Sequence, residues 1–307
     1  MTATVSGPAR SLERYYRMLL RAYPPSYRRA HGDELLDVLL ATTEADRAVP
    51  SAREAAGLLI GGARARVIAL THGNVARDGL HLGLAAVAVG NLATILPFAA
   101  EIPFWITLSA LSVLAILRAW VWPAIPLTAA VSMKTVAIAG GWQFAEPTLL
   151  PLTPGVLTDR ALFADSSPVA VAAAYGLMIV GLLVLGTGRA TLRRRSWWWW
   201  AALPVAAWAG PAWMPDDSQP VISFSRMVLE FGLFAGAVVA GYLTRDLRWA
   251  LGCALYLGVV SVTFGVLTLP EDGLSLTSQH LAYWALLALL TAAAAFIPFR
   301  QRKHVLD

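Results

Sequence analysis

The chain divides near residue 79 into two stretches with different hydrophobic patterns. Before that point, apolar residues recur three or four positions apart among charged ones, as on one face of an amphipathic helix. After it, long apolar runs are separated by short polar breaks, and runs of about 20 apolar residues are typical of membrane-spanning helices. The pattern predicts an all-α polytopic membrane protein, with a cytoplasmic helical head at 1–78, a transmembrane bundle at 79–300 and a cytoplasmic tail at 301–307.

The head is predicted to contain three helices. Ser11 is expected to cap the first, and the prolines at 24–25 to end it. Ser26 is expected to cap the second. The third begins at Ser51, because Glu54 follows three residues later and completes a capping box. Within that third helix, Gly61-Gly62 marks either a weak point or a place where another element packs closely.

Eight spans are expected in the bundle, at 80–98, 102–117, 120–141, 168–187, 197–214, 225–243, 249–269 and 280–299. Only Arg118 and its neighbours separate the second span from the third. With eight spans, nearly all arginines in the connecting segments lie on the cytoplasmic side and nearly all acidic residues lie outside. This distribution agrees with the positive-inside rule. Fusing the second and third spans would move Arg193–Arg195 outside. The chain is therefore predicted to lie in the cell membrane, with both termini in the cytoplasm.

Two features between the spans stand out. The segment 142–167 is the longest break and is proline-rich, so it is expected to be irregular. Trp197–Trp200 directly follow the arginine cluster and fit an aromatic belt at headgroup level. A tryptophan cage for a cation is the alternative, although four consecutive helical residues point in different directions. The arginine cluster itself could recruit anionic lipid.

The composition and motifs of the chain give little evidence for a catalytic site. Hydrophobic residues make up 57% of the 307 residues and charged ones 14%. The chain has one cysteine, Cys253, which is expected to be a small buried hydrophobe, and it lacks the common phosphate-loop, zinc-protease and nucleophile-elbow motifs. The five histidines are scattered, and each, His81 included, is expected to be interfacial or solvated. We expect no enzyme activity, no cofactor and no metal site.

Charged residues inside the expected spans are more informative, because a charge at membrane depth is costly and usually has a partner or a function. Lys134 lies in the third span, and Glu230 lies in the sixth with Arg226 one turn before it. Arg226 and Glu230 are spaced to pair on one helix face. Lys134 is at a similar depth to Glu230, which permits a pair between helices. These charges form either a structural ion pair or a ligand or proton site open to the outer face, unless the spans are misplaced.

The head resembles a known module. Its segment Tyr15–Leu40 contains Leu-Leu-Arg-Ala-Tyr-Pro, then a basic aromatic stretch, then Gly-Asp-Glu before an apolar helix. This is similar to the permease prefix domains of some ABC transporter permeases and to HTH-associated helical signalling proteins found beside PadR-like transcription regulators. The resemblance covers roughly residues 10–72 and implies no catalytic residues. The bundle shows no large extracellular domain between its first two spans, which favours the signalling relatives.

Three functions follow from these observations. The first is a membrane signalling protein whose head binds a PadR-like regulator or another partner through Tyr15, Tyr23, Tyr27, Leu35, Leu36 and Leu39. The second is a permease-like transport component working with an ABC-type ATPase in trans, with Asn91, Ser112, Thr128, Lys134 and Glu230 along a polar path. A membrane enzyme has the least support, since the acidic doublets of the bundle look like outer loops. The head's modest charge, with acids interleaved, argues against direct nucleic-acid binding.

Overall fold

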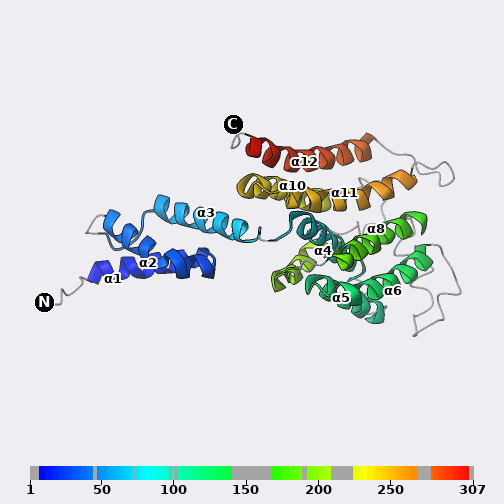
Figure 1. Cartoon of the computed structure of the whole chain (residues 1–307), viewed down its shortest axis with the longest axis horizontal. Helices are drawn as coiled ribbons and strands as arrows, with labels where there is room; N and C mark the ends of the chain where they lie inside the picture. Colours follow the sequence, from blue (N-terminus) through cyan, green and yellow to red (C-terminus); the bar gives the residue numbers. More distant parts are fainter. Residues whose placement is uncertain are drawn as a thin grey trace. The chain divides into compact units, whose positions relative to one another are not determined.

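The chain forms two compact units in a computed structural model, Met1–His72 and Gly73–Asp307 (Figure 1). The structure describes residues 7–43, 47–71, 73–96, 99, 103–139, 168–188, 192–208, 224–267 and 278–303. Within these ranges the secondary structure is helical, without a strand, which confirms the all-α class. The division between the units lies close to the boundary expected at residue 78.

The head contains α1 (Gly7–Leu19), the 3-10 turn η1 (Leu20–Ala22), α2 (Pro25–Thr42) and α3 (Ala52–Ala69). Its amphipathic helices turn their apolar faces toward one another, and five buried side chains form the core: Leu12, Tyr16, Leu20, Leu36 and Leu58. The stripes read from the sequence therefore define the interior of the head. This unit has a core of its own.

The helix starts in the head follow the expected caps in one case out of three. Ser51 accepts a hydrogen bond from the Glu54 amide at 3.2 Å while the Glu54 carboxylate accepts one from the Ser51 amide at 3.0 Å, so the capping box is confirmed. The cap at Ser26 is wrong: Pro24 is the residue before α2, and Pro25 occupies its first turn, where a missing amide proton costs nothing. Ser11 lies inside α1, and its hydroxyl donates to the Ala48 carbonyl at 3.1 Å.

Gly61 and Gly62 are a close-packing site, and α3 runs through them unbroken. A methyl group on Gly62 would lie 2.6 Å from the Ala22 Cβ, and one on Gly61 would lie 2.5 Å from the Tyr23 hydroxyl. Further along α3, Arg66 donates to the carbonyls of Ala22 at 2.5 Å and Arg21 at 2.7 Å. These bonds satisfy carbonyls that the short turn η1 leaves open, and they fasten α3 to it.

The second unit is a helical bundle whose described helices are α4 (Val75–Ile95), α5 (Pro103–Leu117), α6 (Val121–Ala139), α8 (Pro168–Thr187), α9 (Ala202–Trp208), α10 (Phe224–Thr244), α11 (Arg248–Leu267) and α12 (Ser278–Lys303). Three described segments are long and apolar enough to cross a membrane: Pro168–Thr187, Arg226–Thr244 and Leu281–Arg300. A shorter apolar helix, Pro103–Leu117, falls below that length.

The count of eight such spans is not supported by the described residues. The expected span at 197–214 begins as a 3-10 turn, η4 (Trp197–Ala201), and continues as α9, of which seven residues are described; residues 209–214 lie outside the described part of the chain. A 3-10 turn rises about 2 Å per residue but is rarely longer than a few residues, so it does not extend a span far. The predicted irregular segment 142–167 lies outside the described residues.

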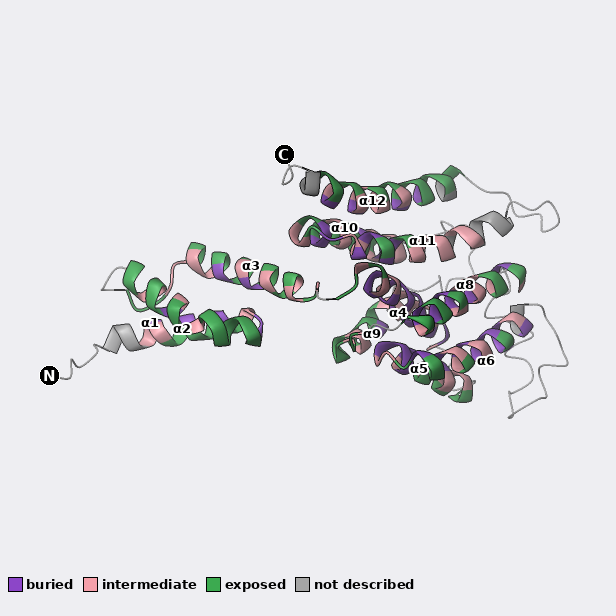
Figure 2. Cartoon of the chain, viewed as in Figure 1, coloured by how far each residue is buried: buried purple, intermediate pink, exposed green. Residues whose placement is uncertain are grey.

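Helix α4 occupies the centre of the bundle and packs against α5, α8, α9 and α11, most extensively against α11. Figure 2 shows buried residues on α4 where neighbouring helices cover it. Its contact with α11 is close because Gly79 and Gly83 carry no side chain there. A methyl group on Gly79 would lie 2.7 Å from the Arg248 carbonyl oxygen, and one on Gly83 would lie 2.9 Å from that of Gly252. This is the small-residue packing used between helices in membranes.

A smaller core lies between α10, α11 and α12. Its buried members are Phe234, Cys253, Tyr283 and Leu287. Cys253 is a free, buried thiol, as expected from its apolar surroundings.

Candidate functional site: two buried polar clusters

The turn between α10 and α11 brings charged residues to one end of the bundle. Arg245 has a left-handed backbone, with φ of 53°, which reverses the chain after α10. Asp246 follows, and its carboxylate accepts a hydrogen bond from the Arg248 amide at 3.1 Å at the start of α11. The same carboxylate receives the Arg248 guanidinium, with Nη2 2.9 Å from Oδ2. The local sequence Arg-Asp-Leu-Arg thus fixes both the turn and the orientation of Arg248.

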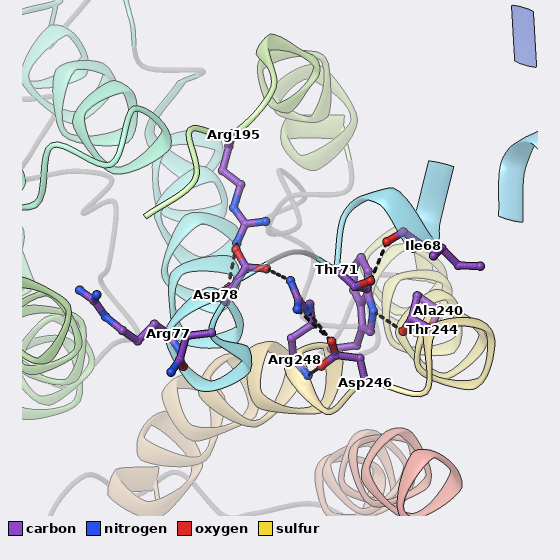
Figure 3. A network of polar contacts seen from close by, with 11 residues as sticks. Ile68, Thr71, Arg77, Asp78, Arg195, Ala240, Thr244, Asp246 and Arg248 are labelled. Atoms are coloured by element: carbon purple, nitrogen blue, oxygen red, sulfur yellow. Dashed lines mark hydrogen bonds and ion pairs between the residues drawn. The ribbon is translucent and has the colours of Figure 1, made fainter. Parts of the chain in front are cut away.

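Asp78, in the first turn of α4, joins two arginines from distant parts of the chain. Arg248 donates through Nη1 to Oδ2 of Asp78 at 2.7 Å, and Arg195 donates through Nη2 to Oδ1 at 2.6 Å. Arg195 also donates to the Asp78 backbone carbonyl at 2.8 Å. Figure 3 shows both arginine side chains reaching this carboxylate. We call Asp78, Arg195, Asp246 and Arg248 the Asp78 cluster.

The Asp78 cluster is buried and electrically balanced. Arg248 is only 1% exposed, and both aspartates are buried as well. Two carboxylates face two guanidinium groups, so each charge that is withdrawn from water has an opposite charge at hydrogen-bond distance. Burial lowers the pKa of Arg195 and the Asp78 charge opposes that shift. This arrangement stabilises the contact between the helices, because both carboxylates already accept hydrogen bonds from arginine side chains.

Hydrogen bonds to backbone carbonyls near the cluster join the ends of other helices to this region. The Arg195 amide donates to the Leu117 carbonyl at the end of α5 at 2.7 Å. His81 Nε2 lies 2.6 Å from the Ile116 carbonyl oxygen, and Arg77 donates to the Leu185 carbonyl near the end of α8. The starts of α4 and α11 and the ends of α5 and α8 therefore meet at one end of the bundle. His81 was expected to be interfacial or solvated, and the solvated alternative is wrong, because this side chain is buried and holds α4 to α5.

A second polar cluster lies between α10 and α11. Arg226 donates through Nε to Oε1 of Glu230 at 2.9 Å, which confirms the pair expected from their spacing. The Tyr256 hydroxyl from α11 donates to the same oxygen at 2.6 Å. Glu230 is 3% exposed, and its second oxygen, Oε2, has no hydrogen-bond partner among the described residues. The buried hydroxyl of Tyr283, from α12, is likewise unpaired within the described part of the chain.

Lys134 belongs to neither cluster. Its ammonium group lies 5.6 Å from the centre of the Trp105 ring of α5, within the range of a cation–π contact. Glu230 is bonded to Arg226 and Tyr256 instead, so within the described residues the pair between Lys134 and Glu230 does not form. Similar depth in two helices was insufficient, because α6 packs mainly on α5 and α8 while α10 packs on α11 and α12.

Other polar residues expected along a transport path are used to join helices. The hydroxyls of Ser112 in α5 and Thr128 in α6 lie 2.8 Å apart. The Asn91 amide of α4 lies 3.4 Å from the Met178 sulfur of α8. Pro126 lies inside α6, which continues past it. The contacts of Ser112, Thr128 and Asn91 therefore join neighbouring helices.

In the head, the expected partner-binding residues separate into two groups. Tyr15 and Tyr27 are exposed, and Tyr27 stacks on Tyr23 with ring centres 5.1 Å apart. Leu36 is buried in the head core, and Leu35, Leu39 and Tyr23 pack against it. The assignment of Leu36 to a partner surface is therefore wrong, since the apolar face of α2 is already covered by α1 and η1.

The four tryptophans also separate. Trp197 and Trp198 are exposed, whereas Trp199 and Trp200 pack against the main core of the bundle. The Arg118 guanidinium lies 4.1 Å from the centre of the Trp197 ring.

The Asp78 cluster was not predicted from the sequence. The sequence pattern places Asp78 in the head and its two arginine partners in cytoplasmic loops between spans. Two signals were present: the Gly79-x-x-x-Gly83 spacing directly after Asp78, and the assignment of Arg195 and Arg248 to the same side of the membrane. Together they place two arginines at the end where α4 begins.

Within the described ranges no group of three or more His, Cys, Asp or Glu side chains is arranged to hold a metal ion. Comparisons with known protein families, with characterised proteins and with solved structures found no match to this chain.

Proposed function

We propose that the chain is a non-enzymatic membrane signalling component whose cytoplasmic head binds a protein partner. The observation that carries the proposal is that the head has its own core and still leaves an apolar face on α1 exposed. Tyr15 and Met18 are three residues apart on α1, so they lie on one face, and Met18 is 55% exposed. Exposed apolar groups that cluster on a small unit often mark an interaction surface.

The chemistry of this face indicates the kind of partner. Arg14 and Arg21 flank Tyr15 and Met18 at helical spacing, and neither forms an ion pair within the described residues. An aromatic ring and a thioether between two arginines fit a surface that combines apolar and acidic residues. We propose an acidic face of a cytosolic regulator, with a PadR-like transcription regulator as the leading example because of the resemblance of the head.

The test uses the full chain with a photo-crosslinking residue, benzoylphenylalanine, in place of Tyr15 or Met18. Val38, which is exposed on α2, is the matched control position. The proposal expects one discrete crosslinked cytosolic protein from positions 15 and 18, weakened by Arg14→Gln and Arg21→Gln. Equal crosslinking from position 38, or crosslinks to lipid alone, would contradict it.

We further propose that the bundle crosses the membrane eight times with both termini in the cytoplasm. Support comes from the three long apolar helices and from the polar contacts that gather the starts of α4 and α11 with the ends of α5 and α8. Helices that alternate in direction and meet at one charged end agree with an even number of crossings. The positive-inside rule supports a cytoplasmic location for that end, because most arginines between the expected spans lie there.

The single cysteine makes this topology measurable. In a Cys253→Ala background, new cysteines replace Trp198, Arg245 or Glu146, and intact cells are treated with a membrane-impermeant maleimide. Glu146 should be labelled in intact cells, and the other two only after permeabilisation. Labelling of position 198 or 245 from outside would refute the proposed orientation.

A permease-like component is the second candidate, favoured by one observation: Oε2 of Glu230, and the hydroxyl of Tyr283 on the neighbouring helix α12, have no hydrogen-bond partner among the described residues. A transport path requires that such groups be reachable from water. Glu230→Cys in the Cys253→Ala background should then react with an impermeant maleimide on intact cells. Absence of reaction, with full labelling after denaturation, would exclude access from that side.

A further inference from the structure

Three exposed tryptophans and two arginines lie near the bond between the Arg195 amide and the Leu117 carbonyl. On one side of this bond lie Arg118 and Trp120, and on the other lie Arg194, Trp197 and Trp198. The three tryptophans are exposed, Trp198 to 82%. The Arg118 guanidinium, 4.1 Å from the Trp197 ring centre, joins the two sides. We call these five residues the arginine–tryptophan surface.

The charge of this surface is positive, and no described acidic residue compensates it. Of the arginine triplet in the sequence, Arg195 turns inward and is neutralised by Asp78, while Arg194 is exposed. Arg118 and Arg194 have no acidic partner within the described part of the chain. The triplet is therefore not one uniform basic patch, since its third member belongs to the Asp78 cluster.

We propose that the arginine–tryptophan surface binds the phosphate headgroups of anionic phospholipids in the adjacent leaflet. A guanidinium presents paired N–H donors that match phosphate oxygens. Tryptophan rings favour the interface between headgroups and acyl chains, so they hold the arginines at phosphate depth. The surface continues into the apolar helices α5 and α6, which favours a lipid over a soluble acidic protein. The inference rests on the proposed membrane location and adds a lipid class to it.

The test measures lipid selectivity of the full-length protein reconstituted in phosphatidylcholine bilayers. Spin-labelled phosphatidylglycerol or phosphatidylcholine reports the fraction of lipid immobilised at the protein. Wild type should prefer phosphatidylglycerol, and Arg118→Gln with Arg194→Gln should reduce that preference by about thirtyfold, given the usual contribution of each basic residue near a membrane surface. Arg300 is an exposed arginine near the C-terminal end of α12. Arg300→Gln is the matched control and should keep the preference for phosphatidylglycerol.

Two measurements keep the outcomes distinct. If the protein does not immobilise either lipid, the membrane location itself fails. If it immobilises both equally, only the lipid-binding inference fails.

A salt series on the wild type needs no variant: the preference should fall as ionic strength rises, because exposed charges are screened. A preference that salt leaves unchanged, or that Arg300→Gln reduces as much as the double variant, would overturn the inference. Trp197→Phe should cause a smaller loss, because Arg118 keeps its charge but loses its best aromatic support.

Discussion

Asp78 and Arg248 are separated by 170 positions in the sequence, yet Oδ2 of one lies 2.7 Å from Nη1 of the other. Both side chains are buried, and the contact joins the first turn of α4 to the first turn of α11. The bond is made next to the glycines that let these two helices approach. Charge pairing and small-residue packing therefore act on the same helix pair.

Asp78→Asn should destabilise the bundle by about 3–5 kcal/mol. The substitution keeps the shape of the side chain but removes the negative charge that Arg195 and Arg248 share. Arg248 then keeps only Asp246, and Arg195 keeps no acidic partner among the described residues. Thermal unfolding of the purified protein in detergent measures the effect.

Asp33→Asn is the control for that experiment, because Asp33 is exposed on α2 in the head. The same change of charge there should alter the unfolding temperature little. If Asp78→Asn and Asp33→Asn behaved alike, the Asp78 cluster would contribute nothing to stability.

Gly79→Ala should weaken the packing of α4 on α11 by about 1–3 kcal/mol. The added methyl group would lie 2.7 Å from the Arg248 carbonyl oxygen and 2.8 Å from the Leu251 Cβ, so one helix must move. Gly90→Ala, on the same helix, meets nothing within 4 Å and should be neutral or stabilising by up to about 1 kcal/mol through helix propensity. The measurement is the difference in unfolding temperature between the two variants, and equal values would contradict close packing at Gly79.

Arg226→Gln should be more destabilising than Glu230→Gln, by about 3 against about 1 kcal/mol. The asymmetry arises because the Arg226 side chain is 43% exposed while that of Glu230 is buried. Removal of the arginine leaves a buried carboxylate with only the Tyr256 hydroxyl, whereas removal of the carboxylate leaves an arginine that can turn outward. The double variant should be no worse than Arg226→Gln alone, and a double-mutant cycle of unfolding free energies gives the coupling.

The sequence pattern predicted the helical class, the capping box and the pair of Arg226 with Glu230. These features depend on residues three or four positions apart, which helix geometry brings together without tertiary information. It also predicted the bounds of α8, where a continuous apolar run begins with a proline and ends near a glycine.

Features that depend on which helices are neighbours were missed. Lys134 and Glu230 share a depth but lie on helices with different packing partners, and Leu36 was assigned to a surface although α1 covers it. The cap at Ser26 failed for a local reason: Pro25 fixes a helical φ one residue earlier and starts the helix there. Periodicity identifies an apolar face but not the element that covers it.

The head should lose stability at both acid and alkaline pH through two groups that share one hydrogen bond. The Tyr16 hydroxyl lies 3.1 Å from the Glu54 carboxylate. The Ser51 amide hydrogen bond lowers the pKa of Glu54 below 4.5, so its contribution is present above pH 4.5 and is lost as the pH falls through the folded-state pKa. Burial raises the pKa of Tyr16 above 10.0, so its contribution is present below pH 10 and is lost as the pH rises through the higher folded-state value.

Hydrogen exchange of head peptides in the full-length protein, corrected for intrinsic rates, measures both losses. Glu54→Gln should lower the protection of α3 near neutral pH and remove its decline below pH 4.5, because an amide holds the Ser51 bond weakly and does not titrate there. Tyr16→Phe should remove the alkaline decline and leave the acid one. If Glu54→Gln left the acid decline intact, another carboxylate would have to cause it, and the capping box would not set the acid limit of the head.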